Sequence, residues 1–332
     1  MKRCIYAGAL SLPAELEGFL RGRGVEFTYN PLKRALGEDD LVSLLKDYDA
    51  ALAGGEPYTE RVMAAAPRLK IIARTGVGYD QIDVPAATKR GIVVTTTPVP
   101  ELSYAVAEMA IGHLLGFVKR IPQLNRAIRL GEWDRQKWTR EVGDAYHLTL
   151  GLVGAGRIGF EVAKRARALG MKVVYYDVVR MAEVEKTAGA EYVGLDELLA
   201  TADAVSLHVP LTPATKGMVD RRFLGKMKKT AFLINTARGK IVDEQALADA
   251  LAEGTIAGAC LDVLNEEPPT EKSPFFRLGD RLPNLILTPH AANGPYTFGR
   301  MAMAAAEDVA RVLEGKPPAY PLNREALSPQ TG

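Results

Sequence analysis

The stretch LGLVGAGRIGFEVAKRARALGMKVVYYD, residues 150–177, constrains the fold of this chain more than any other. It reads as a buried strand, a glycine-rich turn, a helix and a second strand that ends in a carboxylate. Gly154, Gly156 and Gly159 fit the spacing G-x-G-x-x-G: the first allows a tight turn, the second lets the backbone approach a pyrophosphate, and the third lets the helix pack on the strand. The context predicts a dinucleotide-binding unit.

The residues after the turn and at the end of the second strand define the expected contacts to the cofactor. The backbone N–H groups of Arg157 and Ile158 open the helix, where its dipole favours phosphate. Asp177 follows at the distance that places a carboxylate against the ribose hydroxyls. A carboxylate there repels the additional phosphate of NADP, so we expect NAD, and Arg180 is the one opposing hint.

Short apolar runs alternate with helical or polar segments along the whole chain. Before the glycine turn the runs occupy residues 3–9, 25–29, 49–54, 69–76 and 91–97, and from residue 148 they occupy 148–154, 172–177, 204–210, 230–237, 256–263 and 285–290. Such alternation predicts parallel sheets covered by helices. The expected fold class is α/β, with two doubly wound parallel-sheet domains, Rossmann-like or flavodoxin-like.

A long helix is predicted between the two series of strands. Apolar residues and His113 recur with helical spacing from Leu102 to Phe117, and Ser103 is a candidate for the helix cap. Glu108 and His113 interrupt the apolar sequence of residues 105–118, which is also shorter than the ~20 residues of a membrane span. We therefore expect a buried helix and no contact with a membrane.

The charge and cysteine content narrow the expected partners. The formal net charge is +2, with both signs mixed through a chain in which 25% of residues are charged, so no nucleic-acid-binding stripe is expected. Cys4 and Cys260 are the two cysteines and lie far apart, which leaves no disulfide framework and no Cys-x-x-Cys metal or redox site. We expect a cytoplasmic protein with a small-molecule substrate and no metal.

Three further segments lie at or just after the ends of predicted strands: NTARGKIVDE (235–244), LDVLNEEPP (261–269) and LTPHAANG (287–294). Together with TGVGYDQID, GAGRIG and LHVPLT, in this order, they resemble the D-isomer-specific 2-hydroxyacid dehydrogenases. That family includes the glyoxylate, hydroxypyruvate and D-lactate enzymes and 3-phosphoglycerate dehydrogenase. The resemblance covers essentially the whole chain and implies hydride transfer between NAD and a small D-2-hydroxy acid or 2-oxo acid.

The resemblance implies three catalytic residues, Arg238, Glu267 and His290. Their chemistry suits reduction of a 2-oxo acid. A guanidinium offers paired donors for the substrate carboxylate and carbonyl, so Arg238 also counts as a substrate-binding residue. Histidine titrates near neutrality and suits His290 as acid and base, while Glu267 orients the imidazole and stabilises its charged form.

The other histidines are weaker candidates for the proton donor. His113 lies on the apolar face of the long helix and His208 within a predicted strand, so both are interpreted as packing residues or as residues that contact a catalytic side chain rather than the substrate. His147 lies in a polar connection and is expected to be exposed. His290 follows a proline at a strand end, where catalytic side chains of an open α/β sheet are found.

Further contacts are implied by the resemblance alone. Asp262 meets the nicotinamide amide, the backbone around Val209 and Pro210 lines the adenine side, and Thr236 is a cofactor-binding residue. The amides of Val77 and Gly78 hold the substrate carboxylate, and Gly154, Gly156 and Gly159 hold the pyrophosphate.

The resemblance also implies the organisation of the chain. Residues 1–102 and 293–332 form a substrate-binding domain, and residues 103–292 form an NAD-binding Rossmann domain. The active site is expected in the cleft between them. The helix region 103–121 is expected to pack against a second subunit and make a homodimer.

Two features depart from the family pattern, and three rival functions are considered. The chain has one additional residue before Ala105, and Asn293 stands where a small residue is usual, which leaves the substrate and the orientation of the long helix open. The physiological direction is also open. Arg74, beside the TGVG loop, is a possible contact to a substrate phosphate. Formate dehydrogenase replaces the glutamate partner of histidine by glutamine, so Glu267 argues against that activity. A phosphite dehydrogenase and a non-catalytic, NAD(H)-sensing corepressor stay as alternatives.

Overall fold

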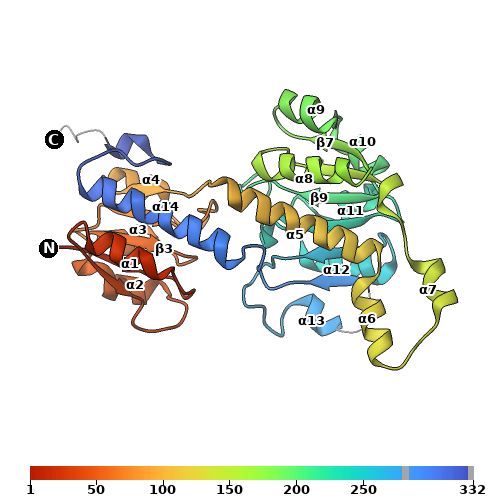
Figure 1. Cartoon of the computed structure of the whole chain (residues 1–332), viewed down its shortest axis with the longest axis horizontal. Helices are drawn as coiled ribbons and strands as arrows, with labels where there is room; N and C mark the ends of the chain where they lie inside the picture. The colour runs from red at the N-terminus through yellow and green to blue at the C-terminus, as the bar shows by residue number, and fades with distance from the viewer. Residues whose placement is uncertain (279–283, 328–332) are drawn as a thin grey trace. The chain divides into compact units, whose positions relative to one another are not determined.

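The computed structural model describes residues 1–278 and 284–327. The chain divides into two compact units, one formed by Met1–Leu102 with Asn293–Gly332 and the other by Ser103–Ala292. Each unit contains one sheet, and all pairs of neighbouring strands in it are parallel. Figure 1 shows the chain coloured from its N-terminus to its C-terminus. The expected α/β class with two parallel sheets is confirmed.

The first unit contains a five-stranded sheet in the order β2-β1-β3-β4-β5. This is the 2-1-3-4-5 order of flavodoxin-like doubly wound folds. Its elements are β1 (Lys2–Tyr6), α1 (Ala14–Arg21), β2 (Val25–Tyr29), α2 (Glu38–Leu44), η1 (Leu45–Asp47), β3 (Ala50–Ala53), α3 (Glu60–Ala64), β4 (Ile71–Arg74), α4 (Val84–Lys89), β5 (Val93–Thr95), α14 (Pro295–Leu313) and η5 (Arg324–Leu327).

Helices cover both faces of this sheet. One apolar cluster joins the sheet to α1 and the C-terminal helix α14, and a second joins it to α2, α3 and α4. All four residues of β3 are buried, because side chains on both faces of a covered parallel strand point into a core. This burial explains why the strands read as continuous apolar runs.

The second unit contains a seven-stranded sheet in the order β12-β11-β10-β9-β6-β7-β8. From the other edge, the first six strands follow the Rossmann order 3-2-1-4-5-6, with β12 added. Its elements are α5 (Pro100–Val118, with its first three residues in the first unit), α6 (Ile121–Arg129), α7 (Arg135–Glu141), η2 (Ala145–His147), β6 (Thr149–Val153), α8 (Arg157–Ala168), β7 (Lys172–Tyr176), α9 (Ala182–Ala188), β8 (Glu191–Tyr192), α10 (Leu195–Thr201), β9 (Ala204–Leu207), α11 (Arg221–Lys226), β10 (Phe232–Asn235), η3 (Gly239–Ile241), α12 (Glu244–Glu253), β11 (Gly258–Leu261), α13 (Pro274–Leu278) and β12 (Leu285–Leu287).

The helices of this unit also lie on two faces of its sheet. One apolar cluster contains residues of α5, α8 and α9, and the other contains residues of α10, α11, α12 and α13. Phe117 of α5 stacks on Phe232 of β10 with ring centroids 4.3 Å apart. The helix α5 is therefore fixed to the middle of the sheet, close to the strands that carry the predicted catalytic segments.

One local expectation is wrong, and one strand was not predicted. The helix α5 begins at Pro100, so Ser103 lies inside its first turn and is not its cap. Proline is favoured at the first position of a helix because the missing N–H would have no helical partner there. The strand β8 was not predicted, because its two residues are exposed and form no apolar run.

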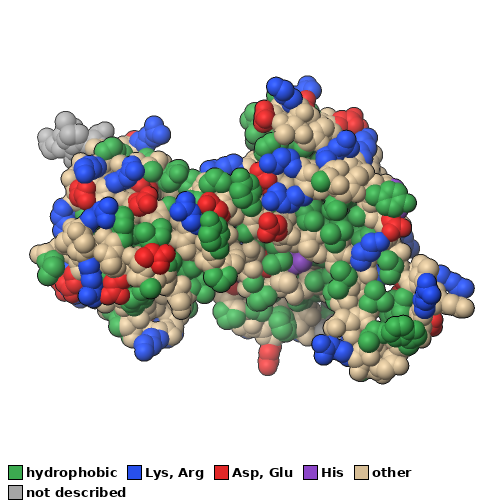
Figure 2. Space-filling model, in the orientation of Figure 1, with side chains coloured by type: hydrophobic (Ala, Val, Ile, Leu, Met, Phe, Trp, Pro, Cys, Tyr) green, Lys and Arg blue, Asp and Glu red, His purple; other side chains and the backbone are tan. Residues whose placement is uncertain are grey.

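No helix in residues 1–278 and 284–327 is long and apolar enough to cross a membrane. On the face drawn in Figure 2, basic and acidic side chains are interspersed over both units. Cys4 and Cys260 are buried free thiols.

Candidate active site

The glycine turn between β6 and α8 has the geometry that the motif predicts. Gly154 has φ of 96°, and a Cβ atom on it would lie 2.6 Å from the backbone oxygen of His208. A Cβ on Gly159 would lie 2.3 Å from the oxygen of Gly154, so helix and turn are in direct contact there. A Cβ on Gly156 would meet nothing within 4 Å. The protein itself thus requires the first and third glycines, and the second leaves open space for a ligand.

The start of α8 offers backbone donors beside this space. Gly156 precedes the helix without a side-chain cap, and the first helical hydrogen bond runs from Phe160 N–H to Gly156 O. The amides of Arg157 and Ile158 therefore belong to the first turn, whose N–H groups have no partner within a helix. Such a terminus favours an anionic group, and a pyrophosphate fits it.

Asp177, directly after β7, is tied to the same turn. Its Oδ2 accepts a hydrogen bond from Ala155 N–H at 2.8 Å, and the side chain is half-buried. Arg180, the hint that opposed NAD, donates from Nε and Nη2 to the two carboxylate oxygens of Glu185, at 2.7 and 2.9 Å. The hydrogen bonds from Arg180 and Tyr175 lower the pKa of Glu185 to about 2. Arg180 is therefore engaged with a carboxylate that stays ionised.

The other cofactor residues follow the neighbouring strands. Val209 lies beside the turn, its Cγ1 being 3.0 Å from the Cβ position of Gly154, and Pro210 is exposed. Thr236 is buried after β10, and its Oγ1 has no hydrogen-bond partner within the described residues. A buried hydroxyl without a partner costs free energy of folding unless a ligand or a water molecule forms a hydrogen bond with it. These residues fit a bound dinucleotide.

The side chain of Asn235 shapes the loop that carries Arg238. Asn235 is fully buried at the end of β10, where its Oδ1 accepts from Ala237 N–H at 3.0 Å and its Nδ2 donates to Arg238 O at 2.9 Å. The guanidinium of Arg238 donates from Nη1 to Ala237 O at 2.7 Å and is half-buried. Sequence reasoning missed the role of Asn235, although its position at the end of a buried strand was the available signal.

Gly239 brings the second catalytic segment against the first. A Cβ atom at this position would lie 2.0 Å from the carbonyl carbon of Leu264 and 2.5 Å from the nitrogen of Asn265. The backbone of the loop before Glu267 thus occupies the space that any other side chain would need. This close contact is the physical reason for a glycine after Arg238.

Glu267 and His290 form a hydrogen-bonded pair. Oε2 of Glu267 lies 2.7 Å from Nδ1 of His290, and Oε1 accepts from Leu264 N–H at 3.0 Å. Burial opposes ionisation of the carboxyl group, but the hydrogen bonds to His290 and Leu264 and the charge of Arg238 outweigh it and lower the pKa of Glu267. Glu267 thus interacts with both other predicted catalytic residues, through a hydrogen bond with His290 and through the charge of Arg238.

Asp262 occupies the turn between β11 and the His290 loop. Its side chain is 1% exposed, and Oδ1 accepts from Ala291 N–H at 3.0 Å and from Thr288 Oγ1 at 2.6 Å. The contact with Thr288 was not predicted.

Val77 and Gly78 lie in the first unit, in the loop after β4, and both are half-buried. Arg74 donates from Nε to Gly78 O at 2.9 Å and from Nη1 to Thr75 O at 2.8 Å. The guanidinium of Arg74 therefore orders the loop whose backbone N–H groups are predicted to bind the substrate carboxylate.

Comparison with known proteins identifies related sequences. Residues 111–292 match the family model described as D-isomer specific 2-hydroxyacid dehydrogenase, NAD binding domain. A glyoxylate reductase of Korarchaeum cryptofilum is 44% identical over 300 residues, which are 89% of this chain and 86% of that protein. A D-3-phosphoglycerate dehydrogenase of Methanocaldococcus jannaschii is 40% identical over 284 residues, 85% of this chain but 53% of the longer relative.

Solved structures show the same architecture. The crystal structure of D-lactate dehydrogenase from Aquifex aeolicus, complexed with NAD and lactic acid, superposes with a TM-score of 0.83 at 28% sequence identity. The superposition covers 99% of this chain and 100% of that chain.

Proposed function

Since the chain belongs to the D-isomer specific 2-hydroxyacid dehydrogenase family and is an NAD-dependent oxidoreductase of 2-hydroxy and 2-oxo acids, we propose that it reduces glyoxylate with His290 as the acid. The observation that carries the proposal is the 2.7 Å hydrogen bond between His290 and Glu267. NADH supplies the hydride when it is bound. The relatives favour neither phosphite oxidation nor corepression.

The residues of the chain have distinct tasks in this proposal. Arg238 binds the carboxylate and polarises the carbonyl of the oxo acid, because its planar fork donates in two directions. His290 gives its proton to the carbonyl oxygen as negative charge develops there. Glu267 holds the ring by Nδ1 and stabilises its positive charge before the transfer.

The proposed substrate is small and carries no phosphate. Glyoxylate reductases recur among the relatives that are 41% to 44% identical to this chain. Arg74, the sequence candidate for a phosphate contact, donates to the carbonyls of its own loop. We assign the first unit to the substrate carboxylate, through Val77 and Gly78, and the second unit to NAD.

A panel of oxo acids tests this function. Purified protein is mixed with NADH and glyoxylate, hydroxypyruvate, pyruvate or 3-phosphohydroxypyruvate, and separately with NAD and phosphite. We expect the highest kcat/KM with glyoxylate and loss of most activity in His290→Ala, which keeps NADH binding by fluorescence. A higher kcat/KM with the phosphorylated acid would contradict the substrate assignment, and full activity of His290→Ala would contradict the mechanism.

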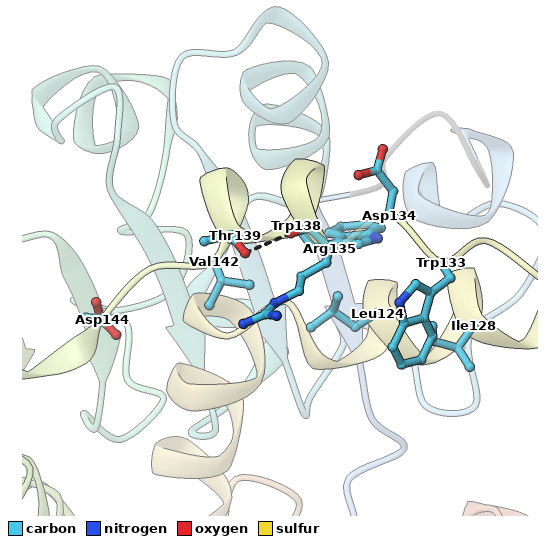
Figure 3. A pocket seen from close by; sticks show the side chains of 9 residues that line it. All are labelled: Leu124, Ile128, Trp133, Asp134, Arg135, Trp138, Thr139, Val142 and Asp144. Carbon is cyan, nitrogen blue, oxygen red and sulfur yellow. Dashed lines mark hydrogen bonds between the residues drawn. The ribbon is translucent and has the colours of Figure 1, made fainter.

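We also propose that the chain forms a homodimer through the predicted region 103–121 and the helices that follow it. Large apolar side chains are exposed there: Ile121 at 55%, Ile128 at 50%, Leu130 at 66% and Trp133 at 83%. The helices α6 and α7 line a pocket of about 460 Å³. Figure 3 shows its lining side chains, with Leu124, Ile128 and Trp133 at one side. Exposed apolar surface of this kind is typical of an interface.

Light scattering on a sizing column tests the homodimer. The wild type should have twice the mass of the chain, and Leu130→Ser combined with Trp133→Ser should shift it toward the single-chain mass. We further propose a cytoplasmic location, since both cysteines are buried free thiols and thiols stay reduced in that compartment.

A further inference from the structure

Two consecutive side-chain hydrogen bonds connect the long helix α5 with Asp262, whose backbone and side chain contact the loop of His290. Nε2 of His113 lies 3.1 Å from Oγ1 of Thr288, and that hydroxyl lies 2.6 Å from Oδ1 of Asp262. Thr288 directly follows β12, and Asp262 directly follows β11. Three elements far apart in the sequence are thereby joined inside one unit.

The direction of the two hydrogen bonds follows from the donor count. Asp262 Oδ1 accepts from Ala291 N–H, and the hydroxyl proton of Thr288 is donated to the same oxygen. A hydroxyl has one proton, so the contact to His113 requires that Nε2 carry the hydrogen and donate it. Burial lowers the pKa of His113, which favours this neutral form, and Nδ1 has no partner within the described residues.

Asp262, the last residue in this series of hydrogen bonds, contacts the backbone of His290 and Ala291. The N–H of His290 donates to Asp262 O at 2.7 Å, and the N–H of Ala291 donates to Asp262 Oδ1. His290 has φ of 51°, a left-handed conformation that is uncommon for residues other than glycine. Such a conformation persists when its surroundings fix it, and the contacts of Asp262 do so on both sides of the residue.

We infer that His113 is a positioning residue of the reaction, which acts through Thr288 to fix Asp262 and the loop of His290. The inference rests on the proposed role of His290 as the acid. His113 is 4% exposed in an otherwise apolar part of α5, where leucine would fill the space without burying polar atoms. Compared with leucine, the imidazole of His113 provides the hydrogen bond to Thr288.

Single-turnover oxidation of NADH by glyoxylate tests the inference. Thr288→Val keeps the shape of the side chain and removes both hydrogen bonds, and His113→Leu removes one. Each should lower the rate constant about tenfold or more, because a small displacement of the proton donor is costly. The KM for glyoxylate should stay within about twofold, since Arg238 is untouched. Thr288→Ser and His113→Gln, which keep the hydroxyl and an N–H donor, should recover most of the loss.

Controls separate positioning from packing. Leu114→Val, a fully buried neighbour on α5, should lower the midpoint of thermal unfolding without lowering the rate constant. The double variant of His113→Leu and Thr288→Val should lose no more than the slower single variant, because both break one chain. If both single variants fold and react at the wild-type rate while His290→Ala is inactive, the inference is overturned and the proposed function stands. If His290→Ala keeps full activity, the proposed function fails, and this inference with it.

Discussion

Nδ1 of His290 and Oε2 of Glu267 lie 2.7 Å apart, so the other ring nitrogen, Nε2, is the one left to exchange a proton with a substrate. The carboxylate stays ionised across neutral pH, because its partners lower the pKa of Glu267. The pair thus fixes the tautomer of the neutral ring and stabilises the charged ring.

Glu267→Gln should move the pH profile of catalysis. The substitution keeps the shape of the side chain and removes its charge, so the protonated ring loses stabilisation. The kcat/KM for oxo-acid reduction needs the protonated ring and falls at high pH, whereas oxidation of the hydroxy acid needs the neutral ring and falls at low pH. Both limbs should shift to lower pH in rate measurements between pH 5 and 9. Unchanged limbs would mean that Glu267 does not contact the titrating group.

Arg238→Lys should restore little of the activity that Arg238→Ala loses. A point charge cannot reproduce the planar pair of donors, so KM for the oxo acid should rise and kcat should fall in both variants. Steady-state kinetics at saturating NADH measure both constants. A lysine variant with kinetics near those of the wild type would assign Arg238 a structural role instead.

Asp177→Ser should narrow the preference for NAD over NADP. The wild-type carboxylate repels a phosphate on the ribose, and the substitution removes that repulsion. It also removes the hydrogen bond from Ala155 N–H, so the KM for NADH should rise as well. The ratio of kcat/KM for the two cofactors measures the effect. The idea fails if the ratio stays that of the wild type.

His208 should make the protein less stable in mild acid. Burial lowers its pKa from the ordinary 6.5 to about 4, and its Nε2 is 2.9 Å from Ser206 Oγ. As pH falls below 6.5, His208 binds a proton in the unfolded chain, whereas in the folded protein it stays neutral until about pH 4. The free energy of unfolding therefore decreases between these pH values. The loss attributable to His208 is about 2 kcal/mol between pH 7 and pH 5.

Denaturant unfolding of wild type and His208→Gln at both pH values checks this difference. The glutamine variant should lose less stability than the wild type over the same interval. Equal losses would show that His208 accepts a proton in the folded protein.

The sheets were predictable because the strands are buried on both faces and read as apolar runs, as β3 and β6 do. The pair Glu267 and His290 was predicted from the resemblance to the family, and the parallel sheet explains why the two side chains meet, since both follow strands that end at the same edge. The strand β8 was not predictable, because its two exposed residues gain their structure from pairing with β7.

The periodicity of apolar residues could not predict the contacts that support the candidate site. His113 and Thr288 are 175 positions apart, and the apolar face on which His113 lies left two interpretations open, a packing residue or one that contacts a catalytic side chain. Helical spacing places a side chain on a face, but the partner that it meets depends on how α5 crosses the sheet. The contact of Gly239 with the backbone of Leu264 depends in the same way on the spacing of two loops.

The three-residue strand β12 stands at one end of the seven-stranded sheet, hydrogen-bonded to β11, and His290 follows it by three positions. Terminal strands of a sheet open at lower free energy than central ones. A fluctuation that freed β12 would withdraw the imidazole from Glu267 without touching β6, α8 and β7 around the glycine turn. We therefore expect mild denaturants to inactivate the protein before they release NADH.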